Sequence, residues 1–539
     1  MEQRNLRILV RNISTPLDVT EAEVIREAIR RLQGMVDKND IISCAVYRRS
    51  VDARKRHDIR LVRSVTVETA MHIPMQKREE LSARLARRAD AVILEEAFPQ
   101  VKIGDRRAGR PVVVGFGPAG MFAGLLLAEN GYRPLILERG GDTASRVTAV
   151  RRFFRERVLD PECNVQFGAG GAGTFSDGKL VTRVNDPLCR YVLERFHTFG
   201  APDTVLTEAK PHVGTDRLRT VVEGIAARIR SLGGEIHFRT RVDGLLCDSS
   251  GVRALQTTDG EIPCGPVILA VGHSARDVYR MLMQNGFDIV PKPFSVGVRI
   301  EHLQQDIDRG LYGEMAGHPA LPKGEYALSC HVDGRGVYTF CMCPGGEVIA
   351  AASEAGGVVV NGMSRYSRDG TNACAAVCVS CESRDPMRFQ RELEERAYAL
   401  AGGDYSAPVQ TLGDFLHHTH GTRPTRVQPT YMEGRGGVLC DMRDLFDADI
   451  CRSLENGFLT FGHRIPGFDA SDAVLTGPET RTSAPYRIQR NAMLTADRCP
   501  NLYPCGEGAG YAGGITSAAL DGIRCALAVM AAYAPYGNA

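Results

Sequence analysis

The 539-residue sequence has no dominant charge, no long apolar run and no apolar leader at its start. Lysine and arginine total 66 against 64 acidic residues, so the net charge of +2 does not call for a nucleic-acid or acidic-membrane partner. No uninterrupted apolar run reaches the roughly 18 residues that span a bilayer. Because the first residues, MEQRNLRILV, also lack the apolar core of a secretory signal, we expect a cytoplasmic protein that does not enter a membrane.

Cysteine is present, but without a disulfide framework. The sixteen cysteines are scattered through a chain that is too long to need covalent staples, so we expect reduced, mostly buried thiols. Cys374, Cys378 and Cys381 have a spacing that can hold an iron–sulfur cluster. Their segment is typical of a strand, however, which favours buried thiols, and we predict no metal site.

The positive charge is concentrated at the N-terminal end. Residues 1–110 contain 23 lysines and arginines against 16 acidic residues. This excess is compatible with RNA binding, but basic positions on the solvent side of two strands explain it more simply. The apolar periodicity predicts strand, helix, two strands and a second helix that runs through residues 77–93. That β-α-β-β-α order indicates a compact α+β module and is compatible with a ferredoxin-like arrangement.

The pattern of apolar and polar residues changes after a polar, glycine-rich linker at residues 102–111. From there on, short apolar runs alternate with amphipathic helices, which predicts an α/β Rossmann-like domain. Between residues 291 and 495 we expect mainly strands and loops, with one clear helix at residues 385–400. The predicted domains are residues 1–104, the N-terminal module; 110–290, the first part of the Rossmann-like domain; 291–495, an inserted β-rich cap domain; and 496–539, the C-terminal part of the Rossmann-like domain.

The segment PVVVGFGPAGMFAGLLLAENG carries the first glycine motif, at Gly115, Gly117 and Gly120. A buried strand precedes it, a helix follows, and Glu138 ends the next strand. Gly115 allows the tight turn, Gly117 lets a pyrophosphate approach the backbone, and Gly120 lets the helix pack closely on the sheet. The free N–H groups at the helix start attract phosphate, and Glu138 is placed to accept hydrogen bonds from a ribose. The motif therefore predicts dinucleotide binding.

A second match to the same pattern lies at Gly168, Gly170 and Gly173. It follows no apolar strand, and the residues after it, TFSDGKL, are a poor opening for a helix. We interpret it as a loop whose small residues lie against the same dinucleotide, with Lys179 offering a positive charge to that ligand. The chain contains no further strand–glycine motif–helix unit, so we expect one bound dinucleotide.

The C-terminal segment YPCGEGAGYAGGITSAALDG indicates which dinucleotide is bound. A strand runs into a glycine-rich turn and then a helix, the form found where a helix N-terminus points at a flavin. Glu507 would hydrogen-bond near the ribityl chain, and the N–H groups around Gly514 and Ile515 would meet the pyrimidine edge of the ring. The helix dipole there would stabilise negative charge on a reduced flavin.

Together with FGAGGAGTFSDGKL, PHVGTDRL, KPFSVGVRIEH and GPETRTSAPYRI, these segments resemble the bacterial family of uncharacterised FAD-dependent dehydrogenases. The resemblance runs from about residue 110 to the C-terminus, and the N-terminal module is also typical of the family. It implies FAD, a Rossmann-type domain interrupted by an insertion, and an oxidoreductase role. It also places Val242 at the adenine, and Gly506, Glu507 and Ile515 on FAD-binding positions. The predicted cofactor-binding residues are Gly115, Gly117, Pro118, Ala119, Gly120, Glu138, Arg139, Gly171, Lys179, Val242, Gly506, Glu507, Gly514 and Ile515.

No catalytic residue is predicted, because flavin itself accepts or gives the hydride. Cys341 and Cys343 would lie on one face of a strand and are candidates for a redox-active or substrate-facing pair. A polar loop carries His417, His418, His420, Arg423 and Arg426, which are candidates for an acid, a base or an anion site, although a solvated loop is the simpler interpretation.

We expect an FAD-dependent oxidoreductase that passes hydride or electrons to or from an unknown small substrate. NAD(P)H is a possible transient electron donor. Two alternatives stay open at this point: a flavoprotein that acts on RNA through its basic N-terminal module, and a flavin-binding sensor without turnover.

Overall fold

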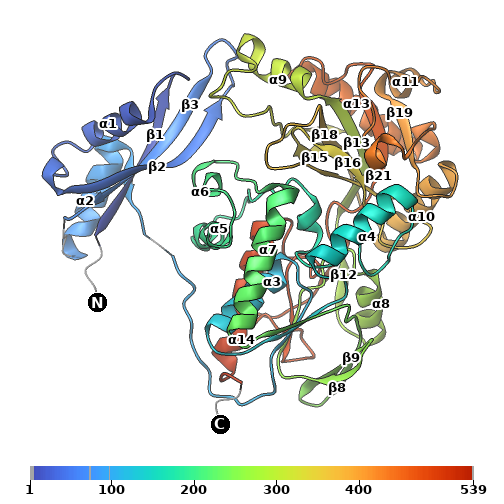
Figure 1. Cartoon of the computed structure of the whole chain (residues 1–539), viewed down its shortest axis with the longest axis horizontal. Helices are drawn as coiled ribbons and strands as arrows, with labels where there is room; N and C mark the ends of the chain where they lie inside the picture. Colours follow the sequence, from blue (N-terminus) through green and yellow to red (C-terminus); the bar gives the residue numbers. More distant parts are fainter. Residues whose placement is uncertain (1–4, 72–74, 96, 537–539) are drawn as a thin grey trace.

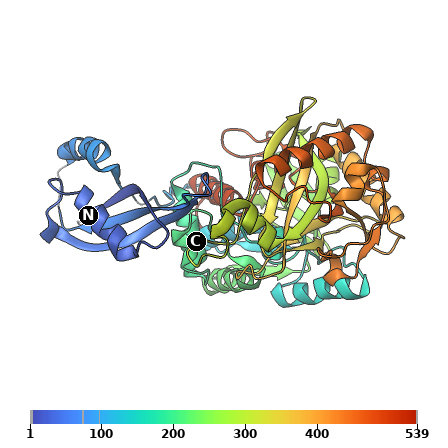
Figure 2. The same cartoon turned by 90° about the horizontal axis from the view of Figure 1, so that it is seen from above.

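The computed structural model describes residues 5–71, 75–95 and 97–536. A small N-terminal module lies beside a larger body, which holds a Rossmann-type domain and a cap (Figure 1). Seen from above, the module projects to one side of that body (Figure 2). The predicted fold class is confirmed.

The N-terminal module has the ferredoxin-like order β-α-β-β-α-β. Its sheet runs β2-β3-β1-β4, and apolar side chains of α1 and α2 cover one face. The helix α1 begins where Thr20 and Glu23 cap each other's backbone N–H groups. The prediction of one helix through Ile93 was wrong, because α2 ends at Ala89 and the next apolar residues pair with β1 as a fourth strand. The elements are β1 (Leu6–Thr15), α1 (Glu21–Arg31), β2 (Ile41–Asp52), β3 (Arg60–Thr69), α2 (Met75–Ala89) and β4 (Ala91–Ile93).

The module touches both parts of the larger body. Leu17 and Leu61 pack against Tyr312 of the cap, and Arg49 forms an ion pair of 2.6 Å with Glu208 of the Rossmann-type domain. The linker that follows the module lies along the C-terminal end of α14, where the Gly104 N–H donates to the Met530 carbonyl.

The Rossmann-type domain is built on a parallel five-stranded sheet in the order β23-β11-β5-β6-β7. Its central strands are three-residue apolar runs that are buried on both faces, as parallel strands require. Helices α3 and α14 cross closely, because a Cβ on Gly522 would lie 2.1 Å from the Ala119 carbonyl oxygen. The core elements are β5 (Val112–Val114), α3 (Pro118–Glu129), β6 (Leu135–Glu138), α7 (Gly214–Ser231), β7 (Glu235–Phe238), β11 (Val267–Leu269), β23 (Leu502–Pro504) and α14 (Ile515–Ala532).

Several shorter elements are inserted between these strands and helices. They include an antiparallel meander, β8 to β10, beside the main sheet. They are α4 (Thr143–Glu156), the 3-10 turn η2 (Ala172–Phe175), α5 (Leu188–Thr198), α6 (Thr204–Thr207), β8 (Val242–Asp248), β9 (Gly251–Thr257), β10 (Gly260–Pro263) and α8 (Arg276–Gln284).

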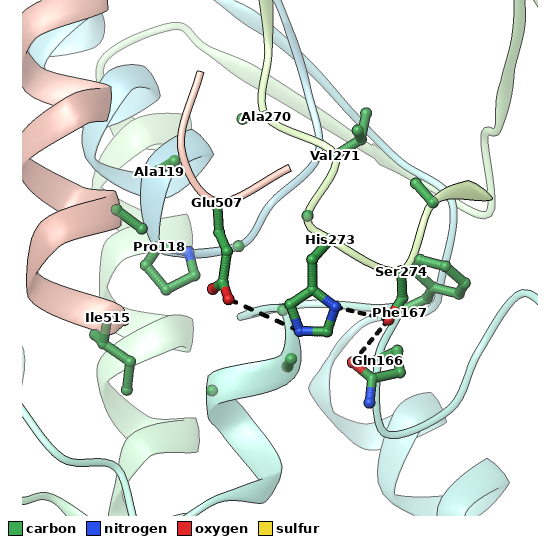
Figure 3. Close-up of a pocket in the computed structure, with 18 of the residues that line it drawn as sticks. Pro118, Ala119, Gln166, Phe167, Ala270, Val271, His273, Ser274, Glu507 and Ile515 are labelled. Atoms are coloured by element: carbon green, nitrogen blue, oxygen red, sulfur yellow. Dashed lines mark hydrogen bonds and ion pairs between the residues drawn. The ribbon is translucent and has the colours of Figure 1, made fainter. Parts of the chain in front are cut away.

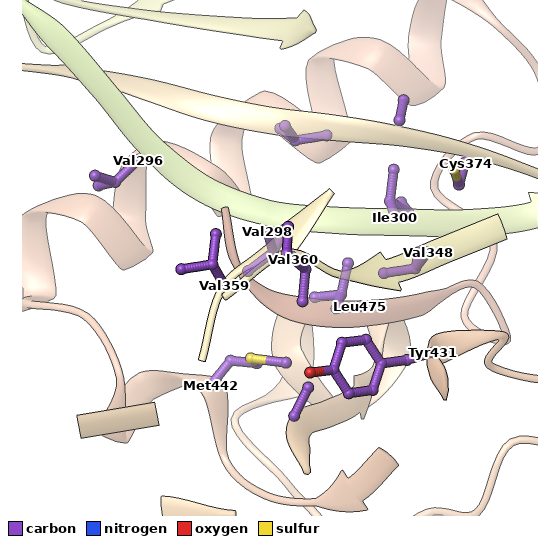
Figure 4. Close-up of a cluster of buried hydrophobic side chains, with 14 of the residues drawn as sticks. Val296, Val298, Ile300, Val348, Val359, Val360, Cys374, Tyr431, Met442 and Leu475 are labelled. Atoms are coloured by element: carbon purple, nitrogen blue, oxygen red, sulfur yellow. The ribbon is translucent and has the colours of Figure 1, made fainter. Parts of the chain in front are cut away.

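The cap contains a seven-stranded mixed sheet in the order β14-β15-β18-β13-β21-β19-β20. Its inner face packs on the β16–β17 hairpin, with Val298, Val360, Leu475 and Tyr431 in one apolar cluster (Figure 4). The sheet strands are β13 (Phe294–Leu303), β14 (Ser329–Val332), β15 (Arg335–Cys343), β18 (Asn372–Cys381), β19 (Ala407–Thr411), β20 (Gly437–Leu439) and β21 (Val474–Glu479), and the hairpin is β16 (Glu347–Ala350) and β17 (Val360–Met363).

The cap has more helix than the sequence analysis predicted. The expected helix α10 (Pro386–Leu400) is present, but so are α9 (Gln304–Tyr312), α11 (Leu412–His417), the short α12 (Tyr431–Gly434) and the long α13 (Ala448–Arg464). The pair β12 (Ile289–Pro291) and β22 (Tyr486–Ile488) joins the two ends of the cap. The domain limits themselves stay predictions.

Helix α14 is long and apolar enough to span a membrane by composition, with a mean hydropathy of 1.5 over 18 residues. Two thirds of it are buried inside the molecule, where it packs on α3 and the Rossmann-type sheet. Its apolar character is therefore that of a core helix.

Candidate functional site: a cavity between two glycine loops, helix α14 and the cap

One elongated cavity runs along the carboxyl edge of the Rossmann-type sheet and ends under the cap. Parallel α/β sheets bind their ligands at this edge. The cavity is lined from the first glycine motif, the second glycine loop, the β11–α8 turn, the start of α14 and the cap strands. Figure 3 shows Pro118 and Ala119 at the start of α3, beside Glu507 and Ile515 from the C-terminal segment. Segments that are distant in sequence therefore share one wall.

The two glycine segments meet each other at the cavity. A Cβ added to Gly171, whose φ is 63°, would lie 2.8 Å from the Gly117 Cα. The Gly170 N–H also donates to the Phe116 carbonyl at 2.8 Å. The second loop thus forms turns and the short η2, not a Rossmann helix, and it faces the same space as the first motif.

Arg146 of α4 holds the second loop in shape. Its side chain is fully buried and donates five hydrogen bonds to loop carbonyls between Asn164 and Gly171, at 2.8 to 3.3 Å. The guanidinium also lies over the Phe175 ring at 5.0 Å. Burial lowers the pKa of Arg146 to about 10, so it stays charged at neutral pH.

Glu138 ties the two glycine segments together. One carboxylate oxygen accepts the N–H groups of Gly140 and Gly168, both at 2.9 Å, and the other accepts the Phe116 N–H at 2.8 Å. Because each oxygen has two lone pairs, the oxygen that accepts only the Phe116 N–H can still accept one hydroxyl group from a ligand in the cavity that Glu138 lines.

The C-terminal segment places a partly buried carboxyl group in the cavity. Glu507 accepts no hydrogen bond from the residues that the structure describes, and its Oε1 lies 3.9 Å from His273 Nε2. Burial raises the pKa of Glu507 to about 7, although Lys292 opposes the shift. Burial, aided by Arg481 and Arg276, lowers the pKa of His273 to about 4. A neutral imidazole therefore faces a carboxyl group that is easily protonated.

A chain of hydrogen bonds sets the proton position on His273 (Figure 3). The Gln166 amide donates to the Ala351 carbonyl, so its oxygen accepts the Ser274 hydroxyl at 3.2 Å. Ser274 Oγ lies 3.0 Å from His273 Nδ1 and, having used its own proton, accepts from it. This leaves His273 Nε2 as an acceptor on the side of the cavity.

The cap end of the cavity carries a buried charge cluster. The Asp177 carboxylate contacts Lys179 Nζ at 2.6 Å, and Arg368 and Ser364 of the cap also donate to it. Burial alone would lower the pKa of Lys179, but Asp177 and Glu325 outweigh it and raise that pKa. Lys179 therefore keeps a positive charge in the cavity, and Asp177 joins the cap to the second glycine loop.

Comparison with known proteins agrees with this architecture. Residues 293–482 match the family model described as FAD-dependent protein, C-terminal domain-like. A protein of Clostridium beijerinckii, described as uncharacterized, is 41% identical over 532 residues, which cover 97% of this chain and 98% of that protein. The chain belongs to this family of FAD-dependent proteins. FAD is its cofactor, and the predicted family membership is confirmed.

Two solved structures show distant similarity to this FAD-dependent protein. Glycine oxidase from Bacillus cereus has a TM-score of 0.30 and 9% identity, covering 78% of this chain and 94% of that one. A geranylgeranyl bacteriochlorophyll reductase-like protein from Thermoplasma acidophilum has a TM-score of 0.34 and 12% identity, covering 78% of each chain. At these scores the similarity carries no argument about the reaction.

The residues of the cavity fit FAD. Gly117 and Gly171 leave the close backbone approach that a pyrophosphate needs. The unpaired Glu507 carboxyl matches a ligand that brings hydroxyl donors, as a ribityl chain does, and the α14 N-terminus offers free N–H groups at Ile515. FAD supplies the hydride-accepting centre when it is bound; the protein supplies these contacts and excludes water.

Most of the predicted cofactor residues line the cavity. Gly120 and Gly506 do not: a Cβ on Gly120 would lie 1.9 Å from the Gly115 carbonyl oxygen, and one on Gly506 would lie 2.7 Å from the Ala119 Cβ, so both allow close packing. Direct contact of each residue with FAD stays a prediction. The lining set is Gly115, Gly117, Pro118, Ala119, Glu138, Arg139, Gly171, Lys179, Val242, Glu507, Gly514 and Ile515.

Of the cysteine, histidine and arginine candidates outside the predicted cofactor set, Cys341 alone is among the described residues that line the cavity. Cys341 lines the cavity, but Cys343 is buried behind it, because a bulge in β15 gives Cys341 a φ of 43° and breaks the alternation. The bulge thus interrupts the predicted strand face, although the Cys341 and Cys343 side chains remain hydrogen-bonded to each other. The cysteines of β18 are buried, as expected. The loop after His417 lies outside the cavity lining, and Arg426 pairs there with Asp472.

Sequence analysis missed Arg146, His273 and Arg481. A signal for His273 existed, because it follows the buried strand VIL at the carboxyl edge, where ligands bind. Arg146 and Arg481 had no such signal, since their partners come from segments that are distant in sequence.

Proposed function

We propose that this FAD-dependent protein is an oxidoreductase, in which non-covalent FAD exchanges hydride or electrons with a small organic substrate held under the cap. The observation that carries the proposal is the continuity of the cavity. The same space that follows the glycine loops extends to Phe340, Cys341, Asn361 and Thr482 of the cap. A protein that only stored FAD would not need such a wall of cap side chains beyond the cofactor loops.

The residues at the cap end of the cavity have separate roles. The start of α14 offers positive potential to the flavin end of the cofactor, which favours its reduced, anionic form. Lys179 adds a full positive charge that its ion pairs maintain. The cap residues exclude water and select the substrate, which is a general requirement for controlled hydride transfer.

NAD(P)H is the electron donor that we propose, as a transient partner that binds without a Rossmann domain of its own. The FAD-loaded protein is mixed with NADH or NADPH without oxygen, and the flavin absorption band is followed. We expect bleaching by a nicotinamide or by a member of a panel of amines, hydroxy acids and amino acids. A protein that dithionite reduces but none of these donors reduces would contradict the oxidoreductase proposal.

Lys179→Met tests the role of the cap end. We expect slower flavin reduction, by about a hundredfold, since a group stabilising the developing anion contributes roughly 3 kcal/mol. Lys323→Met is the matched control, because Lys323 lies at the surface near Asp308. Equal rates for both variants would exclude Lys179 from the reaction.

A further inference from the structure

A second cavity, of about 970 Å³, lies between the Rossmann-type domain and the cap. Its walls come from α4, η2, the start of α7, the β16–β17 hairpin and α12, and Figure 1 shows α4 between α7 and the cap. No described residue lines both this cavity and the FAD cavity. Phe175 of η2 belongs to the second cavity, whereas Gly171 and Gly173 beside it face the first.

One side of the second cavity is apolar. The side chains that form it come from both domains, so a hydrocarbon body placed there would be enclosed on opposite sides. They are Val147, Val150, Phe154, Phe175, Val348 and Ile349.

The α4–α7 end of the cavity is cationic. Arg151 of α4 and Arg219 of α7 line it, and among the described residues neither side chain has a hydrogen bond or an ion pair within 4 Å. The Arg219 Nε is buried and has no partner. Burial lowers the pKa of Arg219, and the charge of Arg151 lowers it further, while Asp216 and Glu223 oppose the shift. Two arginines held near each other, with no acid in ion-pair distance among the described residues, form a receptor for an anion, because an anion would satisfy both.

The acidic residues of the cavity do not cancel this end. Glu433 is paired with Arg155 at 3.4 Å, and the Asp216 carboxylate accepts the Tyr366 N–H at 2.8 Å. Glu347 and Asp369 lie on the cap side, where Arg365 is their cationic neighbour. Asp216 is therefore the acid that faces Arg219 from α7, and it forms no ion pair with Arg151 or Arg219 within 4 Å.

We propose that this cavity binds an amphipathic organic anion: a carboxylate or phosphate head seated between Arg151 and Arg219, with a hydrocarbon body against the apolar side. The planar guanidinium groups present paired N–H donors that match both head groups. The apolar side removes the hydrocarbon from water, which makes the affinity depend on chain length. The ligand would lie against Phe175, on the reverse side of the loop that lines the FAD cavity.

Calorimetry on the full, FAD-loaded chain tests the proposal with decanoate, decyl phosphate, inorganic phosphate and decyltrimethylammonium as probes. We expect one molecule of decanoate or decyl phosphate per chain. Shortening decanoate by two methylenes should weaken binding by about tenfold, as expected from the hydrophobic contribution of each methylene. Inorganic phosphate should bind far more weakly, and the cation should not bind. If decanoate binds and decyl phosphate does not, the head group is a carboxylate, and the reverse result assigns a phosphate.

The double variant Arg151→Met, Arg219→Met should weaken binding of the ten-carbon anions by at least tenfold and leave the flavin spectrum unchanged. The matched control is Arg152→Met, Arg228→Met, which removes two exposed arginines from the same helices, outside the cavity lining. The control should bind like the wild type. Failure of both ten-carbon anions to bind, equal binding of the cation, or binding that the double variant does not weaken would overturn the proposal.

Discussion

Arg146→Met is the substitution whose effect follows most directly from the structure. Arg146 donates to the carbonyls of Asn164, Val165, Gly168, Ala169 and Gly171, all in the second glycine loop. Methionine fills much of the same space but offers no donor. The loop would keep its sequence and lose the group that fixes its path beside the FAD cavity.

The magnitude follows from the number of carbonyls that lose their donor. The carbonyls of Gly168, Ala169 and Gly171 keep a second donor within the loop. The substitution therefore leaves two carbonyls unpaired among the described residues, those of Asn164 and Val165. At about 2 kcal/mol for each, the loss would be about 4 kcal/mol. The loop borders a cavity that water can enter, so we expect water to restore part of this and the net loss to be about 3 kcal/mol. If that loss appears in FAD binding, the Kd rises by about a hundredfold, since 1.4 kcal/mol corresponds to a factor of ten.

The assay is a titration of apoprotein with FAD, followed by flavin fluorescence, together with thermal unfolding. Arg152→Met is the control, because Arg152 is exposed on the same helix and pairs only with Glu156. We expect the control to bind FAD like the wild type. If Arg146→Met also kept the wild-type Kd and melting temperature, the assignment of Arg146 as the residue that shapes the loop would be refuted.

Three further predictions follow from the same site. Gly171→Val should abolish FAD binding, because the valine Cβ would approach the Gly117 Cα. The control Gly402→Val, with a φ of 99° but open space around it, should only reduce stability. FAD titration and thermal melting separate the two effects. Burial raises the Glu507 pKa to about 7, above its unfolded value, so the contribution of Glu507 to stability is present below about pH 4.5 and lost as pH rises through 7. In urea unfolding, the free energy of unfolding of the Glu507→Gln apoprotein should exceed that of the wild type by about 2 kcal/mol at pH 8 and by almost nothing at pH 4.5. Equal curves at both pH values would contradict this. Burial alone would raise the Asp177 pKa, but its cationic partners hold it well below the usual range, so its stabilisation is lost only as the pH falls below about 4. Asp177→Asn should cost about 3 kcal/mol at pH 7, measured by unfolding, because among the described residues it leaves Glu325 alone to balance Lys179 and Arg368.

The parts of the fold that sequence predicts well are those whose signal is local. The apolar run Val112–Val114, the glycines after it and the acid at Glu138 lie close together in sequence, and each has a separate physical task. The C-terminal strand, turn and helix were predicted for the same reason. Their meeting at one cavity could be inferred because parallel strands end at the same edge of a sheet.

The parts that sequence missed depend on tertiary packing. Helix α13 has Gly457 in its middle, which weakens a helical prediction, yet a Cβ there would lie 2.6 Å from Val337, so close packing against β15 requires glycine. The bulge at Cys341 breaks an alternation that the residues alone suggest. Arg146 resembles any arginine of an amphipathic helix until the loop that it binds is folded around it.

The central claim is that two glycine segments and the C-terminal helix enclose a single FAD molecule. Calorimetric titration of FAD into apoprotein, with the bound flavin counted by absorbance after denaturation, tests this claim most directly. We expect one FAD per chain. A protein that stays colourless when FAD is supplied, or one that binds two dinucleotides per chain, would contradict it.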